Sequence, residues 1–457
     1  MKTQIKISNQ IEIILESLPE HIRKIITQEL TLNNPDFLQA EKMDKYTGHL
    51  QRYIYLYQQN GNSLIFPRGY ATRLIALLKQ EGQEYQIDSQ ALTLPPVDFG
   101  SRIKLRPYQL PGAKSLVKNV QGGLVAPCGS GKTETMLAVM AAVKQPALWI
   151  THTKELLEQV IKRALKSFNG MTRDEIGVIA EGKVNVGERL TVALVQTLSR
   201  IDINEIADKF GAVFVDEAHH LGADSFYNAV SKLPARYRLW CSATPEREDG
   251  LTPMITAVGG PVQYTIQDKN LPTLKPELVV VKTKYTGFID PENYPGMVKD
   301  LTTDTTRNQL IIDTVTKAAP GHYSLVLSDR IKHLITLKSM IEKSLPGMSI
   351  EILTGQLSKK QRTDIMERAK ARQVDILLAT QLAREGLDLP HLDRLFLVTP
   401  KRAGNATEQE IGRIRRPCEC KQDAVIFDFW DTENPIFKAQ FWKRRAIYKK
   451  LNIKIGA

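Results

Sequence analysis

The sequence has few cysteines and lacks a long apolar run. Its 457 residues include only four cysteines, Cys128, Cys241, Cys418 and Cys420, which are too scattered for a disulfide framework, so a reducing, intracellular compartment is expected. The longest apolar run, residues 136–143, is far shorter than the ~20 residues that cross a bilayer. No apolar segment typical of a signal peptide follows the first residues. We therefore expect a soluble, cytoplasmic protein.

The composition lacks the bias of disordered or collagen-like chains. It is 42% hydrophobic, 25% charged and 7% aromatic, which is typical of folded globular protein. A formal net charge of +12 favours a polyanionic partner. The charge is uneven, because residues 1–100 carry 10 basic and 11 acidic side chains whereas residues 358–457 carry 21 and 13. We expect the basic surface to lie outside the N-terminal region.

Two proline-containing stretches, residues 93–100 and 268–276, divide the chain. At roughly 150 residues per domain, the length predicts about three domains. We place their bounds at residues 1–97, 98–275 and 276–457.

In the second and third domains, short apolar runs alternate with segments of helical period. Such runs lack polar alternation, which is typical of parallel strands covered by helices on both faces. They are residues 124–126, 147–150, 191–195, 212–215 and 238–241, then 278–281, 324–327, 375–379, 395–398 and 424–427. The predicted fold class is α/β, with two parallel-sheet domains in tandem.

The first domain is predicted to be a small α+β accessory domain. Residues 10–30 have helical periodicity, and residues 52–67 read as a hairpin that turns at Asn60-Gly61. Tyr53, Tyr55 and Tyr57 would then share one strand face. A row of tyrosines can stack on bases, although a partly buried sheet face is the commoner interpretation.

Residues 126–133, Ala-Pro-Cys-Gly-Ser-Gly-Lys-Thr, lie between a predicted strand and a predicted helix. Backbone N–H groups of such a loop can close around a phosphate at the positive end of the helix. Lys132 is expected to contact the β- and γ-phosphates of ATP, and Thr133 to bind Mg²⁺. Ala126 stands where the general pattern has glycine. The nucleotide-binding residues predicted here are Pro127, Cys128, Gly129, Ser130, Gly131, Lys132 and Thr133.

A pair of carboxylates follows the predicted strand 212–215. Asp216 and Glu217 would point into the crevice where α/β sheets bind ligands. Asp216 can hold Mg²⁺ through water, and Glu217 can orient and deprotonate an attacking water. An Asp-Glu pair alone is often a helix cap, but together with the phosphate loop it favours nucleotide hydrolysis.

Five motifs in order resemble those of the superfamily 2 helicases over about residues 100–417. They are Leu105-Arg-Pro-Tyr-Gln109, the phosphate loop, Asp216-Glu-Ala-His, Ser242-Ala-Thr-Pro245 and Gln409-Glu-Ile-Gly-Arg-Ile-Arg-Arg416. The resemblance implies two RecA-like domains that bind ATP between them. It also implies that Arg106 and Gln109 contact adenine, that Gln409 senses the γ-phosphate, that Arg413 and Arg416 act as arginine fingers, and that Gly386 and Asp388 contact the nucleotide.

The same resemblance implies a path for a nucleic-acid strand beyond the strand ends. The predicted DNA contacts are Thr151, Thr153, Lys154, Gln196, Thr197, Arg247, Thr354, Gly355, Thr380 and Arg384. Any one of the threonines can instead cap a helix. The residues predicted to couple the nucleotide to this path are His220, Ser242 and Thr244.

Three further segments resemble XPB and the phage branch-migrating helicases of the UvsW type. They are Arg247-Glu-Asp249, Phe66-Pro-Arg-Gly-Tyr70 and the basic, aromatic tail Phe441-Trp-Lys-Arg-Arg-Ala-Ile-Tyr448. This subgroup implies double-stranded or branched DNA rather than RNA, and the superfamily usually moves 3′ to 5′. We therefore expect an ATP-dependent DNA helicase or translocase that acts on branched DNA, is a monomer, and recognises DNA structure through its first domain. The subgroup suggests a role in DNA repair, recombination or replication, with a phage-encoded protein acting in a host cytoplasm as one interpretation. The helical tail, residues 438–450, is a further candidate DNA surface.

Three alternatives stay open at this point. The Asp-Glu-Ala-His motif also occurs in RNA helicases, and restriction systems use similar motor subunits. A non-hydrolysing switch or DNA-binding scaffold is disfavoured by the presence of Glu217 with Arg413 and Arg416. A structural zinc site is not expected, since Cys418 and Cys420 offer two thiolates without a second pair.

Overall fold

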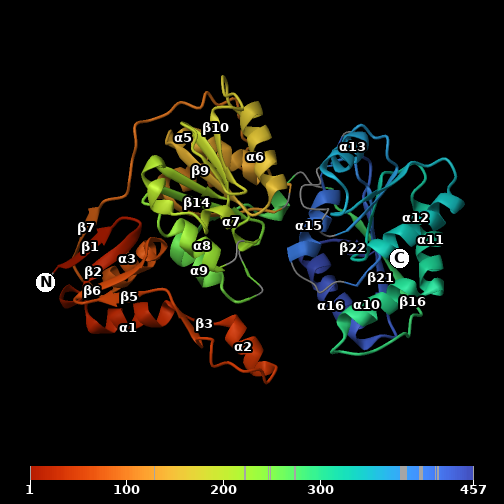
Figure 1. The fold of residues 1–457 in the computed structure, drawn as a ribbon, viewed down its shortest axis with the longest axis horizontal. Coiled ribbons are helices and arrows are strands. Elements are labelled where there is room, and N and C mark those ends of the chain that lie inside the picture. The colour runs from red at the N-terminus through yellow and green to blue at the C-terminus, as the bar shows by residue number, and fades with distance from the viewer. Residues whose placement is uncertain are drawn as a thin grey trace. The chain divides into compact units, whose positions relative to one another are not determined.

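The computed structural model describes most of the chain, which divides into two compact units, Met1–Asn270 and Leu271–Ala457, each considered by itself (Figure 1). The residues outside the description are Met1, Cys128, Leu221, Gly222, Pro245, Glu248, Pro272, Thr273, 381–388, 401–404, Pro417, Glu419, Cys420 and 456–457. Within the described part, no helix is long and apolar enough to cross a membrane.

The first unit begins with a small mixed domain, residues 2–92, called the N-terminal domain below. Its main sheet has the strand order β5-β6-β2-β1-β7, and a separate ribbon pairs β3 with β4. The elements are β1 (Thr3–Ile7), β2 (Gln10–Ile14), η1 (Leu15–Ser17), α1 (Glu20–Glu29), β3 (Thr31–Asn33), α2 (Pro35–Lys42), β4 (Tyr53–Tyr55), β5 (Gln58–Asn60), β6 (Ser63–Pro67), η2 (Arg68–Tyr70), α3 (Ala71–Gln80) and β7 (Tyr85–Ser89).

Two local predictions in this domain are wrong. Residues 10–14 form a strand because Ile11 and Ile13 alternate into the core, and the helix begins only after Pro19. The predicted hairpin is shorter than expected: β5 and β6 turn at Gly61, whose φ is 55°, but β4 ends at Tyr55 and pairs with β3. The break arises where Leu56 turns into the core and donates its backbone N–H to Leu30 O.

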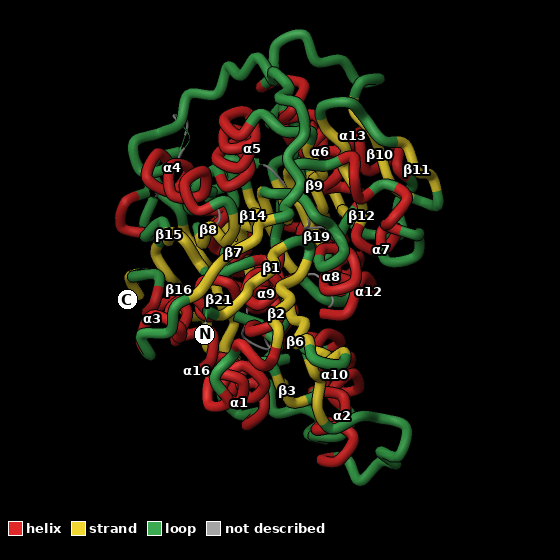
Figure 2. The backbone as a smooth tube through the Cα atoms, turned by 90° about the vertical axis from the view of Figure 1, so that its left-hand side faces the viewer, coloured by secondary structure: helices red, strands yellow, loops and turns green. Residues whose placement is uncertain are grey.

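The rest of the first unit is a parallel-sheet domain, called parallel-sheet domain 1. Its strand order is β11-β10-β12-β9-β13-β14-β8-β15, and Figure 2 shows most of these strands following one another across the view. Only β11 runs antiparallel to its neighbour among the described strands. The strands are β8 (Gln121–Val125), β9 (Ala147–Thr151), β10 (Ile176–Ala180), β11 (Lys183–Asn185), β12 (Leu190–Leu194), β13 (Ala212–Val215), β14 (Tyr237–Ser242) and β15 (Val262–Thr265).

Helices cover both faces of this sheet. In both views α5 and α6 lie over one face, whereas α8 and α9 lie over the other (Figures 1 and 2), and Figure 2 shows α4 on the side of α5. The helices are α4 (Leu110–Asn119), α5 (Lys132–Val143), α6 (Lys154–Ser167), α7 (Val195–Leu198), α8 (Ala223–Val230) and α9 (Thr252–Gly259), with short turns η3 (Ile203–Glu205), η4 (Ala207–Lys209), η5 (Ala218–His220) and η6 (Asp268–Asn270).

Two buried arginines join the N-terminal domain to parallel-sheet domain 1. Arg68 donates to Ser8 O at 3.2 Å, Ala235 O at 2.8 Å and Arg236 O at 3.2 Å. Arg238 donates to Asn9 O at 3.2 Å and to Leu233 O at 2.6 Å. Beside them Gly69 packs so tightly on α9 that a Cβ there would lie 2.4 Å from Gly260 N. The junction is therefore a packed, hydrogen-bonded interface rather than a loose linker.

The second unit is called parallel-sheet domain 2. All paired strands of its sheet, in the order β18-β19-β17-β20-β21-β16-β22, are parallel among the described residues. Its elements are β16 (Glu277–Thr283), α10 (Tyr294–Thr303), α11 (Thr305–Ala318), β17 (Ser324–Leu327), α12 (Ile331–Ser344), β18 (Ile350–Leu353), α13 (Lys359–Lys370), β19 (Ile376–Ala379), β20 (Arg394–Leu397), α15 (Asn405–Ile414), β21 (Val425–Asp431), α16 (Pro435–Lys450) and β22 (Lys454–Ile455).

Alternate residues of these strands feed two separate cores. Leu325 and Leu327 pack with side chains of α13, α15 and α16, whereas Val326 packs with those of α11 and α12. Helices on both faces explain why the strands are apolar throughout. The predicted fold class, two tandem α/β domains after a small α+β domain, is confirmed.

Candidate active site

The loop between β8 and α5 is shaped by two glycines in the left-handed region. Gly129 has φ 83° and Gly131 has φ 79°, and a Cβ at Gly131 would lie 2.4 Å from Gln109 Nε2. Gln109 is buried and donates to Ser130 O at 2.8 Å, while its Oε1 accepts from Arg106 N at 2.8 Å. Gln109 therefore braces the loop itself, a contact that the sequence did not predict. The predicted contact of Arg106 and Gln109 with adenine stays a prediction.

Lys132 opens α5 and points back under the loop. Its ammonium donates to Ala126 O at 3.2 Å and lies 3.2 Å from Glu217 Oε1. Lys132 is only 9% exposed, so this pair is sheltered from bulk water. The residue at 126 contributes its carbonyl oxygen, which explains why an alanine can stand where the general pattern has glycine.

Asp216 and Glu217 follow β13 at the same edge of the sheet. Burial raises the pKa of Asp216 to about 6, and the neighbouring Glu217 carboxylate adds to the rise. The thiol of Cys241, on the adjacent strand β14, donates to Asp216 Oδ1 at 3.2 Å. Glu217 has a φ of 47°, a strained conformation that costs of order 1–3 kcal/mol and clusters at functional sites.

The histidine that links this edge to the end of β14 is His219. Its Nδ1 lies 2.6 Å from Ser242 Oγ and 3.5 Å from Glu217 Oε2. Ser242 also donates to the carbonyl oxygen of Thr244. The sequence prediction named His220, whose side chain lies outside the described part. The role of His220 therefore stays a prediction, and within the described residues it is His219, in the 3-10 turn η5, that contacts Ser242.

Together these groups suit a polyphosphate with a divalent cation. The glycine loop precedes a helix N-terminus, where backbone N–H groups can bind an anion, and Lys132 adds a positive charge. Asp216 and the hydroxyl of Thr133 are oxygen ligands of the kind that Mg²⁺ prefers. Glu217 supplies a carboxylate that can accept a proton. The residues present therefore fit ATP and Mg²⁺.

Two family models match the chain. A model described as "Type III restriction enzyme, res subunit" matches residues 102–247, and "Helicase conserved C-terminal domain" matches residues 306–418. The first match contains the phosphate loop with Asp216 and Glu217, and the second contains Arg413 and Arg416. This chain belongs to the superfamily 2 helicases. It is an ATP-dependent helicase, a hydrolase, and its helicase domains imply that it binds nucleic acid.

Similar proteins come from viruses and archaea. The helicase is 28% identical over 421 residues to the "Putative ATP-dependent RNA helicase L396" of Acanthamoeba polyphaga mimivirus, covering 86% of this chain and 76% of the relative. It is 22% identical over 374 residues to the "DNA 3'-5' translocase XPB2" of Sulfurisphaera tokodaii, covering 74% and 83%. The crystal structure of T4 UvsW covers 100% of this chain and 99% of that one, with 15% identity and a TM-score of 0.46. The two family models and the XPB2 relative confirm the predicted resemblance to superfamily 2 helicases and to XPB.

Several predicted nucleotide residues belong to parallel-sheet domain 2. Arg413 and Arg416, at the end of α15, are half-buried, and Arg416 O accepts from Lys421 Nζ at 3.4 Å. Cys128, Gly386 and Asp388 lie outside the described residues, as does the side chain of Gln409. The roles of these residues in the helicase stay predictions.

The predicted DNA contacts in parallel-sheet domain 1 differ in exposure. Thr151 is fully buried and its hydroxyl donates to Thr153 O at 3.3 Å, so its side chain is not exposed to a strand in this structure, and its role stays a prediction. Thr153 caps α6 by accepting from Leu156 N at 3.3 Å, and Thr197 is buried. Lys154 and Gln196 are exposed, although Lys154 pairs with Glu181 at 2.5 Å.

Arg247 was also predicted to contact DNA. Its side chain is 11% exposed, and its guanidinium forms an ion pair with Asp249 and donates to His219 O at 3.2 Å. These bonds hold the segment after β14 against η5, and the contact of Arg247 with DNA stays a prediction. In parallel-sheet domain 2, Thr354 and Thr380 are buried, Gly355 is exposed, and Arg384 lies outside the described residues.

Only some basic side chains of the tail, residues 438–450, are exposed. Arg444, on α16, is 2% exposed and its guanidinium bonds both carboxylate oxygens of Asp428, at 2.9 and 2.8 Å. Tyr448 OH donates to the same carboxylate at 2.7 Å. Arg445 instead lies over the half-exposed Trp442 ring, 4.7 Å from its centroid. Arg444 is therefore a core residue, and the basic surface of α16 excludes it.

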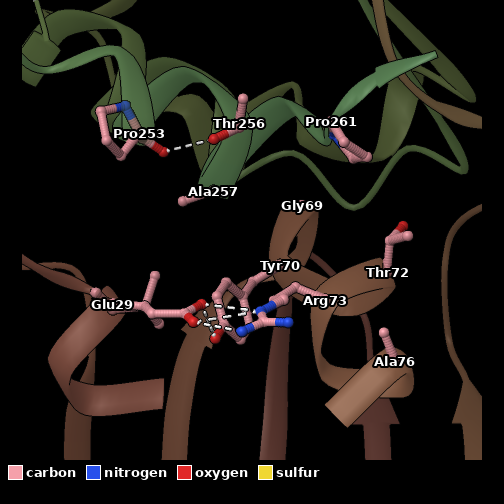
Figure 3. A pocket seen from close by; sticks show the side chains of 11 residues that line it. Glu29, Gly69, Tyr70, Thr72, Arg73, Ala76, Pro253, Thr256, Ala257 and Pro261 are labelled. Atoms are coloured by element: carbon pink, nitrogen blue, oxygen red, sulfur yellow. Dashed lines mark hydrogen bonds and ion pairs between the residues drawn. The ribbon is translucent and has the colours of Figure 1, made fainter. Parts of the chain in front are cut away.

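A separate hollow of about 540 Å³ lies where the N-terminal domain meets α9 (Figure 3). Its polar side chains already pair with one another: Arg73 Nη2 lies 2.7 Å from Glu29 Oε1, and Tyr70 OH donates to Glu29 Oε2 at 2.6 Å. These bonds satisfy the charges inside the hollow, so we interpret it as part of the junction between domains.

Proposed function

We propose that this helicase is a DNA translocase that couples Mg-ATP hydrolysis to the remodelling of branched DNA, moving 3′ to 5′ as a monomer. The observation that carries its ATPase chemistry is the sheltered Lys132–Glu217 pair beneath the glycine loop. The choice of DNA is supported by the XPB-type relative, named a DNA translocase, and by the three sequence segments that resemble the XPB and UvsW type.

In this proposal the ion pair is the resting state of the catalytic groups. Phosphate groups compete for the Lys132 ammonium, which then leaves Glu217. The released Glu217 carboxylate accepts a proton from the attacking water, and its contact with Ala243 N at 3.3 Å keeps the second oxygen oriented. Lys132 thus blocks the base until the nucleotide is present.

Asp216 and Thr133 are the residues that we propose to hold Mg²⁺. When bound, the ion neutralises charge on the phosphates. A cation next to Asp216 favours its ionised form, which opposes the rise in pKa caused by burial. The Cys241 thiol fixes one carboxylate oxygen and leaves the other for the ion or its water.

The proposed link from nucleotide to strand runs through His219 and Ser242. The Nδ1 atom of His219 lies near both Glu217 Oε2 and Ser242 Oγ. A change in the charge or position of the Glu217 carboxylate would therefore alter the hydrogen bond between His219 and Ser242 at the end of β14. We propose this link in place of one through His220, with Thr244 as the next group on the path. Gln409, Arg413 and Arg416 retain their proposed roles as γ-phosphate sensor and arginine fingers.

An RNA helicase is the second candidate, because the mimivirus relative carries that name. The two candidates share the ATP site and differ only in the polynucleotide. A comparison of polynucleotides therefore separates them.

The test measures Mg-dependent ATP turnover with single-stranded, duplex, forked and four-way DNA and with single-stranded RNA. We expect forked and four-way DNA to stimulate most, and the Lys132→Ala variant to stay at background with every substrate while still binding DNA. Lys118→Ala, on the preceding helix α4, is the control and should match wild type. Equal stimulation by RNA would favour the second candidate, and turnover by Lys132→Ala would refute the site.

A further inference from the structure

The ribbon formed by β3 and β4 has two unlike faces. Leu32 and Ile54, paired across the ribbon, pack against the core of the N-terminal domain. The alternate residues of β4 are Tyr53 and Tyr55, which face away from that core with exposed fractions of 39% and 55%. Aromatic side chains on this outward face bury little apolar surface, so packing within the fold does not explain why tyrosines occupy these positions.

The tyrosine rings form a row with a cation at one end. The ring centroids of Tyr53 and Tyr55 are 6.4 Å apart, and those of Tyr55 and Tyr57 are 5.9 Å apart. The guanidinium carbon of Arg52 lies 5.9 Å from the Tyr53 centroid. Successive outward side chains of a strand are about 6.8 Å apart, roughly twice the ~3.4 Å rise of stacked bases. The planes of Tyr53 and Tyr55 are inclined by 56°, so each ring offers its own face, and a base can stack on either one.

The position of the ribbon leaves this row open. In both views β3 and α2 project from the main sheet of the N-terminal domain (Figures 1 and 2). The segment after α2 adds Tyr46, which is 80% exposed and stacks on His49. Its charges are balanced: residues 35–55 hold three acidic and three basic side chains. Attraction for a ligand on this face must come from stacking more than from charge.

We propose that Tyr53 and Tyr55 form a platform on which unpaired bases of branched DNA stack. This inference rests on the proposed function, and it deepens it by assigning recognition of the branch point to one strand of the N-terminal domain. Aromatic rings bind bases of any sequence, because every base has a π-face. The chain is a helicase, so its natural polyanion contains unpaired bases at a fork, whereas blunt duplex offers none.

The test is the affinity of the full chain for forked DNA and for blunt duplex. Tyr53→Leu/Tyr55→Leu should weaken fork binding roughly 10-fold and leave duplex binding unchanged. Tyr53→Phe/Tyr55→Phe should bind forks like wild type, because the rings remain. Ile87→Ala, on the edge strand β7, is the control for an exposed apolar residue of the same domain, 39% exposed, and should change neither affinity.

Salt dependence separates stacking from phosphate contacts. The loss in the leucine variant should stay the same fold-change between 50 and 200 mM salt, since stacking releases few counterions. Fork affinity equal to wild type in the leucine variant would overturn the proposal. A wild-type dimer that the leucine variant converts to a monomer would assign the row to self-association and also overturn it.

Failure of this inference is distinguishable from failure of the proposed function. If wild-type ATP turnover is not stimulated by any DNA, the proposed function fails. If wild type is stimulated by forked DNA and the leucine variant shows the same stimulation and fork affinity, only the platform fails. Unchanged thermal unfolding of the leucine variant, expected from its exposed position, shows that the domain is folded.

Discussion

At the residue scale, the active site is held in a resting arrangement by its own charges. Lys132 neutralises Glu217, and the buried Asp216 relies on the Cys241 thiol and on its neighbours. Because these groups have little access to water, each interaction counts for more than it would on the surface. Nucleotide binding must therefore exchange one set of buried partners for another.

The bond between His219 and Ser242 is a testable part of this arrangement. His219→Ala and Ser242→Ala should each lower the DNA stimulation of ATP turnover about fivefold, and the double variant should lose little more, because residues in contact act as a unit. Fully additive losses would contradict the link. Loss in His220→Ala with His219→Ala unaffected would uphold the original assignment to His220 instead.

The phosphate loop and the Asp-Glu pair are readable from sequence because neighbouring residues form them. Cys241 and His219 could not be predicted in the same way, since their contacts depend on how β14 lies beside β13. Thr151 and Arg247 show another limit of the sequence: their positions near strand ends do not reveal that local hydrogen bonds already engage their polar groups. The roles of Gln409, Arg413 and Arg416 stay predictions.

At the scale of elements, α11 and α12 are joined by a buried histidine. His333 Nε2 lies 2.9 Å from Asn308 Oδ1, and its Nδ1 lies 2.9 Å from Ser328 Oγ. A neutral ring satisfies both contacts, with Nε2–H donating to Asn308 and Nδ1 accepting from Ser328. Burial lowers the pKa of His333 to about 3, and the Arg307 charge adds to the effect.

This histidine should make parallel-sheet domain 2 sensitive to acid. Its folded-state pKa lies below the ordinary 6.5, so its full contribution is present above pH 6.5 and is lost as the pH falls toward 3. Between pH 7 and pH 5 wild type should lose about 2 kcal/mol more stability than His333→Gln, measured by urea unfolding. Equal losses in the two proteins would contradict the assignment.

Strands were easier to predict than their extents and partners. Runs such as 212–215 and 324–327 match β13 and β17, because strands buried on both faces are apolar throughout. Residues 10–14 were predicted to be helical but form a strand. Over so short a segment, the spacing of their isoleucines is compatible with both the helical and the strand period. The pairing of β3 with β4 is a contact between distant segments, which periodicity does not reveal.

At the scale of the molecule, the N-terminal domain is attached to parallel-sheet domain 1 through Arg68. This residue lies in the Phe66–Tyr70 segment that resembles the UvsW type, and its charge binds carbonyl oxygens just before β14 begins. The strand that ends at Ser242 thus starts at the domain junction. A platform on the N-terminal domain would move with the nucleotide site as one body.

Arg68→Ala should destabilise the first unit by about 3 kcal/mol, because it leaves buried carbonyl oxygens without donors. Arg73→Ala is the matched control: it removes an exposed ion pair with Glu29 and should cost less than 1 kcal/mol. Thermal unfolding measures the stability of each variant, and limited proteolysis within residues 90–104 measures how far the domain junction opens. Similar small effects for the two variants would show that the junction does not depend on Arg68.

The most direct measurement of the central claim is ATP turnover on a four-way DNA junction against single-stranded RNA of equal length, for wild type and Lys132→Ala. Our account predicts that the junction stimulates wild type several-fold more than RNA does, and that Lys132→Ala stays at background with both. Equal or greater stimulation by RNA, or turnover by Lys132→Ala, would contradict it.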